Sequence, residues 1–268
     1  MDIKGQLIQE VEASNFQQVK TILMQYEDLD LMQIEDQQLQ TCLHLACLSN
    51  DLDIFNLIIQ YVEKQIKEKK QFINQNYLKN LIEKVNEEGF TAVHLASFSG
   101  GLEMIQIMVK KAGVQILDKK NVNQLKPIHT AAQGDSHIVL AYLKEMGQDI
   151  EQLDDSGRSP LHWATYQGSE NAACFLIAWG AQIDKPDNLT GMTPLHLAAI
   201  SGCVRLVKKL LLRGADKLAK DQQGMTALDI AKNNEFKTIT EMLYKKKNYI
   251  KDCKEQKKSK IIALIVKL

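Results

Sequence analysis

The chain has 268 residues, with 33 basic and 33 acidic side chains and therefore a formal net charge of zero. This length allows either two globular domains or one elongated repeat array. A zero net charge argues against nucleic acid as a partner, because no overall positive potential attracts phosphate. The five cysteines form no CxxC pair and indicate reduced thiols of a cytoplasmic protein; they are Cys42, Cys47, Cys174, Cys203 and Cys253.

The N-terminal segment, residues 3–36, contains two amphipathic helical patterns. The opening MDIKGQLIQEVEAS lacks the basic start, long apolar run and small-residue cleavage site of a secretory signal. No stretch of the chain approaches the roughly 20 apolar residues that cross a bilayer. Because of their two helical patterns, residues 3–36 are expected to form a helical cap at the start of the chain.

From residue 41 onward, one short motif recurs six times. It reads TCLHLACLSN at 41, TAVHLASFSG at 91, KPIHTAAQGD at 126, SPLHWATYQG at 159, TPLHLAAISG at 193 and TALDIAKNNE at 226. The fourth residue of each copy follows the previous one by 50, 35, 33, 34 and 33 positions. This period and motif resemble the ankyrin repeat, whose signature is a TPLHxA turn and helix. The resemblance covers residues 3–247 and implies an all-α repeat solenoid of about seven helix-turn-helix units, caps included, joined by β-hairpin-like loops.

The copy at residues 193–216 explains the motif physically. Thr193 can cap the first helix, and Pro194 fits its first turn because no amide hydrogen is needed there. Gly202 can end that helix in the left-handed conformation. Residues 204–212 then give the second helix a wide apolar face. One such unit cannot cover this face alone, so order requires stacking on its neighbours.

The first step, of 50 residues, marks an insertion around residues 61–86. Its charges and helix-forming residues predict a lengthened second helix, then a loop and a short extra helix. Two interpretations stay open: a partner-specific feature or a solvated excursion.

Five histidines occupy the same position of successive copies: His44, His94, His129, His162 and His196. Helix axes in a stack lie about 8–10 Å apart, so these rings cannot converge on one zinc ion. We expect each ring to form hydrogen bonds within its turn and to the adjacent repeat. No phosphate loop, GxSxG elbow or activated cysteine accompanies them, so neither a cofactor nor a catalytic site is predicted.

The ankyrin resemblance implies that partners contact the hairpin tips and the exposed side of the first helices. Carried over by position, the predicted partner-binding residues are Phe90, Phe98, Gln133, Asp155, Arg158, Tyr166, Asn188, Ile200, Gln222 and Met225. Exposed aromatic and apolar groups often anchor partners, which singles out Phe98, Tyr166 and Ile200. The alternative is that these three pack against the next hairpin.

The C-terminal copy, residues 224–247, reads as a cap, because Asp229 replaces the histidine and its outer face is polar. A tail, residues 248–268, follows. Residues 245–260 hold eight lysines against one aspartate and one glutamate, and the short apolar run IIALIV comes next. A basic run before an apolar run is typical of the cytosolic side of a membrane helix.

Residues 157–184 and 193–234, with LHWA and KKLLLRGAD, also resemble the ankyrin segment of DHHC-type protein S-acyltransferases. That family's Asp-His-His-Cys element is absent from these residues. The resemblance therefore implies at most a substrate-recruiting segment of such a palmitoyltransferase, and not its catalytic domain.

The sequence thus favours a non-enzymatic, cytoplasmic protein interaction module that binds a protein or extended peptide on the concave face of the stack. Two alternatives remain: the cytosolic, substrate-recruiting segment of a membrane S-acyltransferase, and an adaptor whose residues 245–268 touch an anionic membrane. Nothing in the sequence indicates a homo-oligomer.

Overall fold

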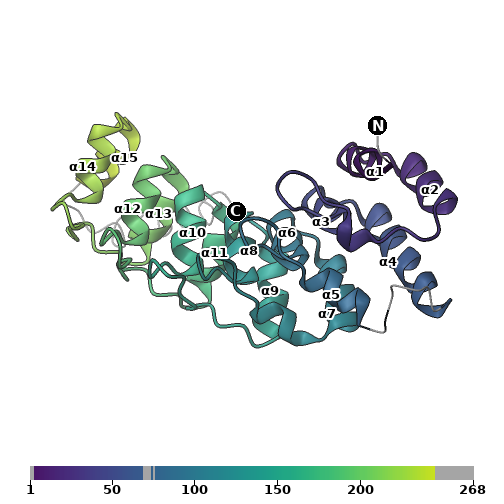
Figure 1. Ribbon diagram of the computed structural model, residues 1–268. Coiled ribbons are helices and arrows are strands. Elements are labelled where there is room, and N and C mark those ends of the chain that lie inside the picture. The colour runs from purple at the N-terminus through teal and green to yellow at the C-terminus, as the bar shows by residue number, and fades with distance from the viewer. Residues whose placement is uncertain (1–2, 69–73, 75, 245–268) are drawn as a thin grey trace, which may run out of the picture. The chain divides into compact units, whose positions relative to one another are not determined.

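The computed structural model describes residues 3–68, 74 and 76–244. Over these residues the chain forms fifteen α-helices and two short 3-10 helices, with two isolated antiparallel bridges and no longer strand (Figure 1). The predicted all-α class is therefore confirmed. The predicted tail, residues 248–268, and the last residues of the C-terminal cap lie outside the described part of the chain.

The chain divides into two compact units: residues 1–155, here called the N-terminal unit, and residues 156–268, the C-terminal unit. The helices of the N-terminal unit are α1 (Ile3–Glu12), α2 (Phe16–Gln25), η1 (Leu31–Gln33), α3 (Cys42–Leu48), α4 (Leu52–Lys67), α5 (Tyr77–Glu83), α6 (Ala92–Ser99), α7 (Leu102–Ala112), η2 (Val114–Asp118), α8 (Pro127–Gln133) and α9 (His137–Glu145). Those of the C-terminal unit are α10 (Pro160–Gln167), α11 (Glu170–Ala178), α12 (Pro194–Ile200), α13 (Val204–Leu212), α14 (Ala227–Asn233) and α15 (Lys237–Tyr244).

Each repeat consists of a short first helix, a tight reversal and a second helix. The first helices are α3, α6, α8, α10, α12 and α14, and within each unit they pack on one another as well as on their own second helices. The reversal always uses a left-handed residue at the same place in the repeat, which is Gly202 (φ 70°) after α12 and the non-glycine Asn50 (φ 55°) after α3. A short side chain such as that of asparagine tolerates this region, so the repeat at α3 keeps the reversal without a glycine.

The buried positions of the first helices hold small residues that allow close packing. Ala96 and Ala131 are fully buried in α6 and α8. At the end of α8 the approach is closer still, because a Cβ atom on Gly134 would lie 1.8 Å from the carbonyl oxygen of Phe98. Only glycine therefore fits there, although its own φ is negative.

The insertion forms a lengthened helix α4 and an extra helix α5, as predicted, and both contact α7 (Figure 1). The Tyr61 hydroxyl of α4 donates to the Tyr26 carbonyl at 2.6 Å and accepts the Leu29 amide at 3.0 Å. Burial raises the pKa of this hydroxyl to about 12, so it stays protonated and can donate.

The Tyr77 hydroxyl of α5 forms a matching pair of bonds, to the Asp30 carboxylate at 2.6 Å and from the Met32 amide at 3.0 Å. Buried Gln65 adds amide bonds to the carbonyls of Glu27 and Leu29. The insertion is therefore not a solvated excursion over its described part. Its polar side chains form hydrogen bonds with backbone amides and carbonyls of the segment between α2 and α3, which lacks a regular hairpin.

Candidate partner-binding surfaces

The five histidines of the repeat form one type of bond pattern. In α3, His44 Nδ1 accepts the Thr41 backbone amide at 3.2 Å, and His44 Nε2 lies 3.0 Å from the Lys84 carbonyl in the next repeat. Because Nδ1 accepts from a backbone N–H, the ring proton is on Nε2, which donates. The Nε2 atoms of the other four rings reach the carbonyls of Leu125, Gln152, Lys185 and Met225 at 2.9–3.2 Å. The predicted structural role is confirmed.

The burial of two of these rings and of the nearby thiols does not suit catalysis. Burial lowers the pKa of His44 and of His94 to about 4, against weaker opposing effects of their backbone hydrogen bonds. Burial likewise raises the pKa of the Cys42 thiol to about 12 and raises that of Cys47 further. These groups are neutral near pH 7. Among the described residues, no three histidine, cysteine, aspartate or glutamate side chains are placed to share a metal ion.

Aspartate or asparagine side chains fix the loops between repeats. Asn121 Oδ1 accepts the amides of Asn123 and Leu125, and Asp221 does the same for Gln223 and Met225, at 2.8–3.0 Å. Such turns are typical of these side chains, which bond the backbone a few residues ahead.

Successive loop tips are also joined by backbone hydrogen bonds. In the N-terminal unit, the Glu87 amide donates to the Gln38 carbonyl and the Asp155 amide to the Asn123 carbonyl. In the C-terminal unit, the Asn188 amide donates to the Ser156 carbonyl and the Gln222 amide to the Thr190 carbonyl. The tips therefore present their side chains from a backbone held on both sides, which suits a preorganised binding surface.

At the last residue of most first helices, one repeat position faces solvent. In chain order its occupants are Leu48, Phe98, Gln133, Tyr166, Ile200 and Asn233. Leu48 and Phe98 are each 42% exposed, and Tyr166 is 43% exposed. Gln133 and Ile200 are half-buried. Here this position is called the exposed helix-end position; in both units it combines apolar side chains with an open face.

The remaining predicted site residues of the N-terminal unit differ in character. The half-buried Phe90 ring meets the His94 ring edge to face at 5.7 Å, and the Phe90 amide and carbonyl are both bonded within the unit. Phe90 is therefore part of the hairpin structure. Asp155 is exposed at a tip.

In the C-terminal unit, Arg158 lies between two aromatic rings and a buried carboxylate. Its guanidinium carbon is 5.7 Å from the Trp163 ring centroid and 5.9 Å from that of Tyr166. Arg158 Nε donates to Asp187 at 3.0 Å, and the Asp187 side chain is fully buried. Arg158 thus fixes the hairpin as well as the Tyr166 ring, so its substitution would alter the fold of this loop.

The other three predicted residues of this unit lie at two neighbouring hairpins. Asn188 and Gln222 are exposed tip residues, and Gln222 Nε2 donates to the Asn188 carbonyl at 3.3 Å. Met225 is half-buried, and its carbonyl accepts the His196 bond.

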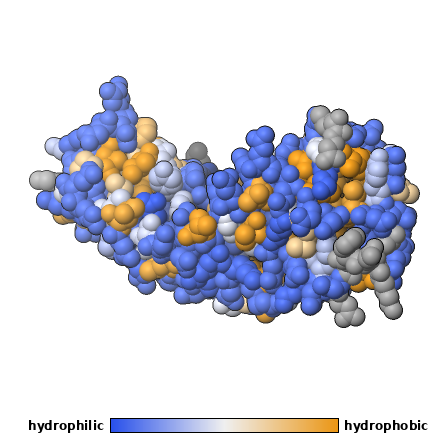
Figure 2. All heavy atoms as spheres, viewed as in Figure 1, coloured by the Kyte–Doolittle hydropathy of each residue, from blue (hydrophilic) through white to orange (hydrophobic). Residues whose placement is uncertain are grey.

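In the view of Figure 2, apolar surface appears as separate orange patches between hydrophilic ones.

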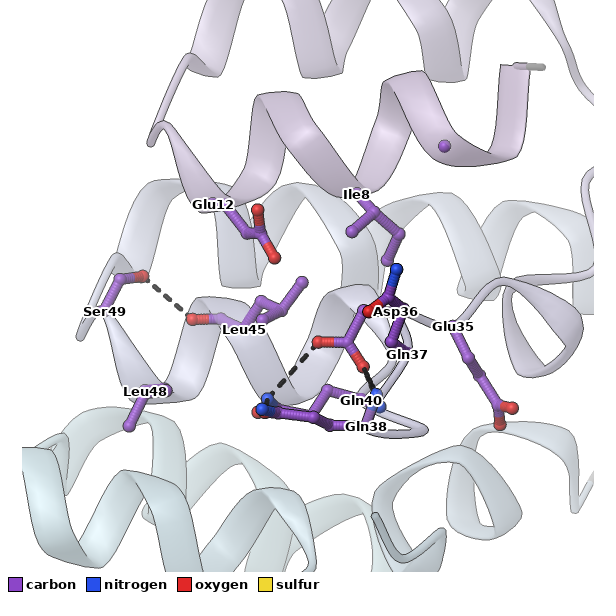
Figure 3. Close-up of a pocket in the computed structure, with 11 residues that line it drawn as sticks. Ile8, Glu12, Glu35, Asp36, Gln37, Gln38, Gln40, Leu45, Leu48 and Ser49 are labelled. Carbon is purple, nitrogen blue, oxygen red and sulfur yellow. Dashed lines mark hydrogen bonds between the residues drawn. The ribbon is translucent and has the colours of Figure 1, made fainter. Parts of the chain in front are cut away.

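A pocket in the N-terminal unit was not predicted. It has a volume of about 840 Å³ and lies between α1, the loop at residues 35–40 and α3 (Figure 3). Ile8 and Glu12 extend from α1 toward Leu45 of α3, and Asp36, Gln38 and Gln40 lie on the loop side. Leu48 at its rim belongs to the exposed helix-end position. The repeat signature is absent from α1, so the sequence offered no alignment that would place Glu12 here.

Comparisons with known proteins agree with this architecture. A family model described as ankyrin repeats (3 copies) matches residues 112–187 and 183–255, and a model of the single ankyrin repeat matches residues 88–121. Protein phosphatase 1 regulatory subunit 27 of Mus musculus is 30% identical over 110 residues, which are 41% of this chain and 70% of that protein.

Several palmitoyltransferases are also similar. The probable palmitoyltransferase AKR2 of Saccharomyces uvarum is 33% identical over 103 residues, or 38% of this chain and 14% of that protein. Palmitoyltransferase AKR1 of Candida albicans is 37% identical over 84 residues, or 31% of this chain and 10% of that protein. The matched region thus spans a small part of these relatives. Among the described helices, none is long and apolar enough to cross a membrane.

Proposed function

Because the chain belongs to the ankyrin repeat family, we propose that it is a protein interaction module that binds a partner protein or an extended peptide through its first helices and hairpin tips. Ankyrin repeats imply protein-protein interaction as a class. The observation that carries the assignment of the surface is the exposed helix-end position. There Phe98 and Tyr166 present aromatic rings on helices whose preceding residues are packed in the core.

Aromatic side chains on a rigid support are the usual anchors of interfaces, because they bury much area at little entropic cost. The hydrogen-bonded tips support the same role, since they need little ordering upon binding. Arg158, Asn188 and Gln222 would add polar contacts at the edge of the interface. Phe90 and Met225 contribute mainly by holding the hairpins.

The test is capture of partners by the wild-type chain and by Phe98→Ser and Tyr166→Ser. A matched control is Phe175→Ser, because Phe175 is exposed to a similar extent (39%) but lies on a second helix. We expect each variant of the exposed helix-end position to weaken capture of the same partner by about 2 kcal/mol, whereas Phe175→Ser leaves capture unchanged. Melting temperatures of the three variants should stay close together. Equal capture by all three would refute the proposal, and unfolding of Phe98→Ser would assign that ring to packing.

A second candidate function is substrate recruitment for protein S-acylation. It is supported by the similarity to the two palmitoyltransferases and by the basic and apolar composition of residues 245–268, which lie outside the described residues. Reading the coding sequence beyond Leu268 tests it. Continuation into a membrane span and a DHHC domain supports this function, and an immediate stop codon removes it.

A further inference from the structure

We propose that the pocket between α1, residues 35–40 and α3 receives the side chain of an arginine or lysine from an extended partner peptide. A nearby apolar residue of the same peptide packs on Leu48 and Phe98. This inference rests on the proposed function and specifies the chemistry of the partner. Four observations carry it: the charge of the pocket, the state of its carboxylates, its apolar wall and its position beside the exposed helix-end position.

The walls of the pocket are acidic. Among the residues that the structure describes, its lining contains Glu12, Glu35 and Asp36 and no lysine, arginine or histidine. The surrounding unit has the same sign, because residues 1–155 hold 23 acidic and 14 basic side chains. The zero net charge of the whole chain hides this excess. A field of this sign attracts basic ligands and repels polyanions.

The three carboxylates are not equivalent. Asp36 accepts the amides of Gln38 and Gln40 at 2.8 and 2.7 Å, so its oxygens serve the loop. Glu35 pairs with Lys84 at the edge of the pocket. Glu12 has no hydrogen bond or ion pair with another described residue, and its carboxylate extends into the pocket (Figure 3). Glu12 is therefore the group available to a ligand.

One available carboxylate suits a basic side chain better than a metal ion. Ca²⁺ takes about six to eight oxygen ligands, and here the other two carboxylates already have partners. A guanidinium or ammonium group needs one carboxylate and a few neutral acceptors, which the side chains of Gln37 and Gln38 at the rim can supply.

The apolar part of the pocket fits the stem of such a side chain. Ile8 and Leu45 face the interior from two helices, and Leu48 is exposed at the rim. Lysine and arginine commonly lay their methylene groups on such surface while the charged end meets a polar group. The pocket thus offers an apolar wall for the methylene groups and a carboxylate for the charged end of such a side chain.

The position of Phe98 adds a spacing rule. Phe98 occupies the same repeat position as Leu48 on the next first helix, and α3 packs on α6. Neighbouring helix axes lie about 8–10 Å apart, which an extended peptide spans in about three residues at roughly 3.3 Å each. We therefore expect the apolar residue of the partner to lie about three positions from the basic one.

The test uses the 268-residue chain and synthetic peptides in a glycine-serine background, each with one arginine and one leucine at different separations. Binding is followed by amide chemical shifts in NMR titrations, which detect weak complexes. The peptide with arginine and leucine three residues apart should bind most tightly, shift the signals of residues 8–12 and 36–49, and lose affinity as salt rises. A peptide with glutamate in place of arginine should bind at least tenfold more weakly.

Two protein variants complete the test. Glu12→Gln keeps the shape of an exposed residue without internal partners and should weaken binding about fivefold. Glu103→Gln removes the same charge from an exposed position of α7 that does not line the pocket, and should change affinity less than twofold. Equal effects of the two variants, or no arginine-dependent binding at millimolar peptide, would overturn the assignment of the pocket. If Glu12→Gln does not change binding while Phe98→Ser still weakens partner capture, only this inference fails and the proposed function stands.

Discussion

In the N-terminal unit, the chain between α2 and α3 is held by side chains that lie 32 to 47 residues further along the sequence, namely Tyr61 and Tyr77. In the C-terminal unit, the hairpin before α12 is held by its own Thr190 and by Arg158 of the preceding hairpin. The difference follows the regularity of the sequence. In the regular repeats the loop bonds come from the loop itself or from the equivalent loop of the preceding repeat. The degenerate start of the array depends instead on side chains of an insertion.

The largest expected effect is a loss of stability of the N-terminal unit in mild acid. His44 and His94 have folded-state pKa values of about 4 because they are buried, whereas an unfolded histidine titrates near 6.5. As the pH falls from 6.5 toward 4, the unfolded chain therefore binds protons that the folded unit does not bind, and the free energy of unfolding decreases. The loss approaches about 1.4 kcal/mol per pH unit for each ring once the unfolded imidazole is fully protonated. Because that imidazole is only half protonated at pH 6.5, the pair removes about 3.2 kcal/mol between pH 6.5 and 5.

Urea unfolding at several pH values, with hydrogen exchange resolved by region, measures this effect. His94→Gln is the control, because glutamine can still accept the Thr91 amide but does not titrate. This variant should reduce the pH dependence by one proton. If the free energy of unfolding of this variant depended on pH as strongly as that of the wild type, the His94 ring would not account for the predicted part of the acid effect.

The next effect concerns the local bonds of the C-terminal unit. Asp187→Ala removes the acceptor of the Thr190 amide, the Thr190 hydroxyl and Arg158 Nε. The loss should be about 3 kcal/mol, because Arg158 is left without its buried partner. Exposed Asp216, which bonds the Leu218 amide at 2.9 Å, gives a control at which alanine should cost less than about 1 kcal/mol.

Chemical denaturation measures both values, and a double-mutant cycle with Arg158→Ala isolates the ion pair. Acid should weaken this pair as well. Burial of the Asp187 carboxylate raises its pKa, but the bonds from Thr190 and Arg158 outweigh burial, and the net pKa is lowered. The contribution is thus present above about pH 4 and lost as the pH falls through the folded-state pKa.

A smaller effect is expected from Tyr61→Phe in the N-terminal unit. It deletes one hydroxyl that bonds the Tyr26 carbonyl and the Leu29 amide, at a cost of about 1–2 kcal/mol. Amide exchange at Leu29 should accelerate. Tyr142→Phe is the matched control, since that hydroxyl makes no hydrogen bond with another described residue. Similar losses in the two variants would contradict the view that the insertion holds the loop.

The smallest effect separates two adjacent residues of α4. Lys64 pairs with Glu27 at 2.7 Å, but both side chains are about half exposed, so Lys64→Ala should change the free energy of unfolding by less than about 0.5 kcal/mol. Gln65 is buried and donates to two carbonyls, so Gln65→Ala should cost several times more. A reversed order would mean that the charge and not the amide fixes residues 27–29.

Much of this architecture could be predicted because the repeat encodes it locally. Where the motif has them, its threonine, proline and histidine predicted the start of the first helix. The recurrence of the histidine, which cannot serve one shared metal ion, predicted that each imidazole bonds the adjacent repeat. The aspartate or asparagine that precedes the cap by five or six residues, as in Asn121 and Asp187, was also visible in the aligned copies and could have been recognised as a loop-fixing position.

Other features depend on contacts that no local pattern encodes. Tyr61 and Tyr77 looked like ordinary helix residues of an insertion, because their partners lie in a loop without a motif. Arg158 was predicted as a partner-binding residue of a hairpin tip, because its bond to the buried Asp187 of the next hairpin is not visible in the sequence. Glu12 acquires its role only because α1 packs beside α3, and that contact cannot be aligned with any regular copy.

The bond from His196 to the Met225 carbonyl sets a limit on how this chain can be shortened. A fragment that stopped after α13 would keep both helices of that repeat, yet the imidazole N–H of His196 would lose its acceptor in the following loop. The natural place to cut therefore lies beyond Met225, one loop later than the helix boundaries suggest. Repeats exchanged between proteins of this kind should carry the next loop with them.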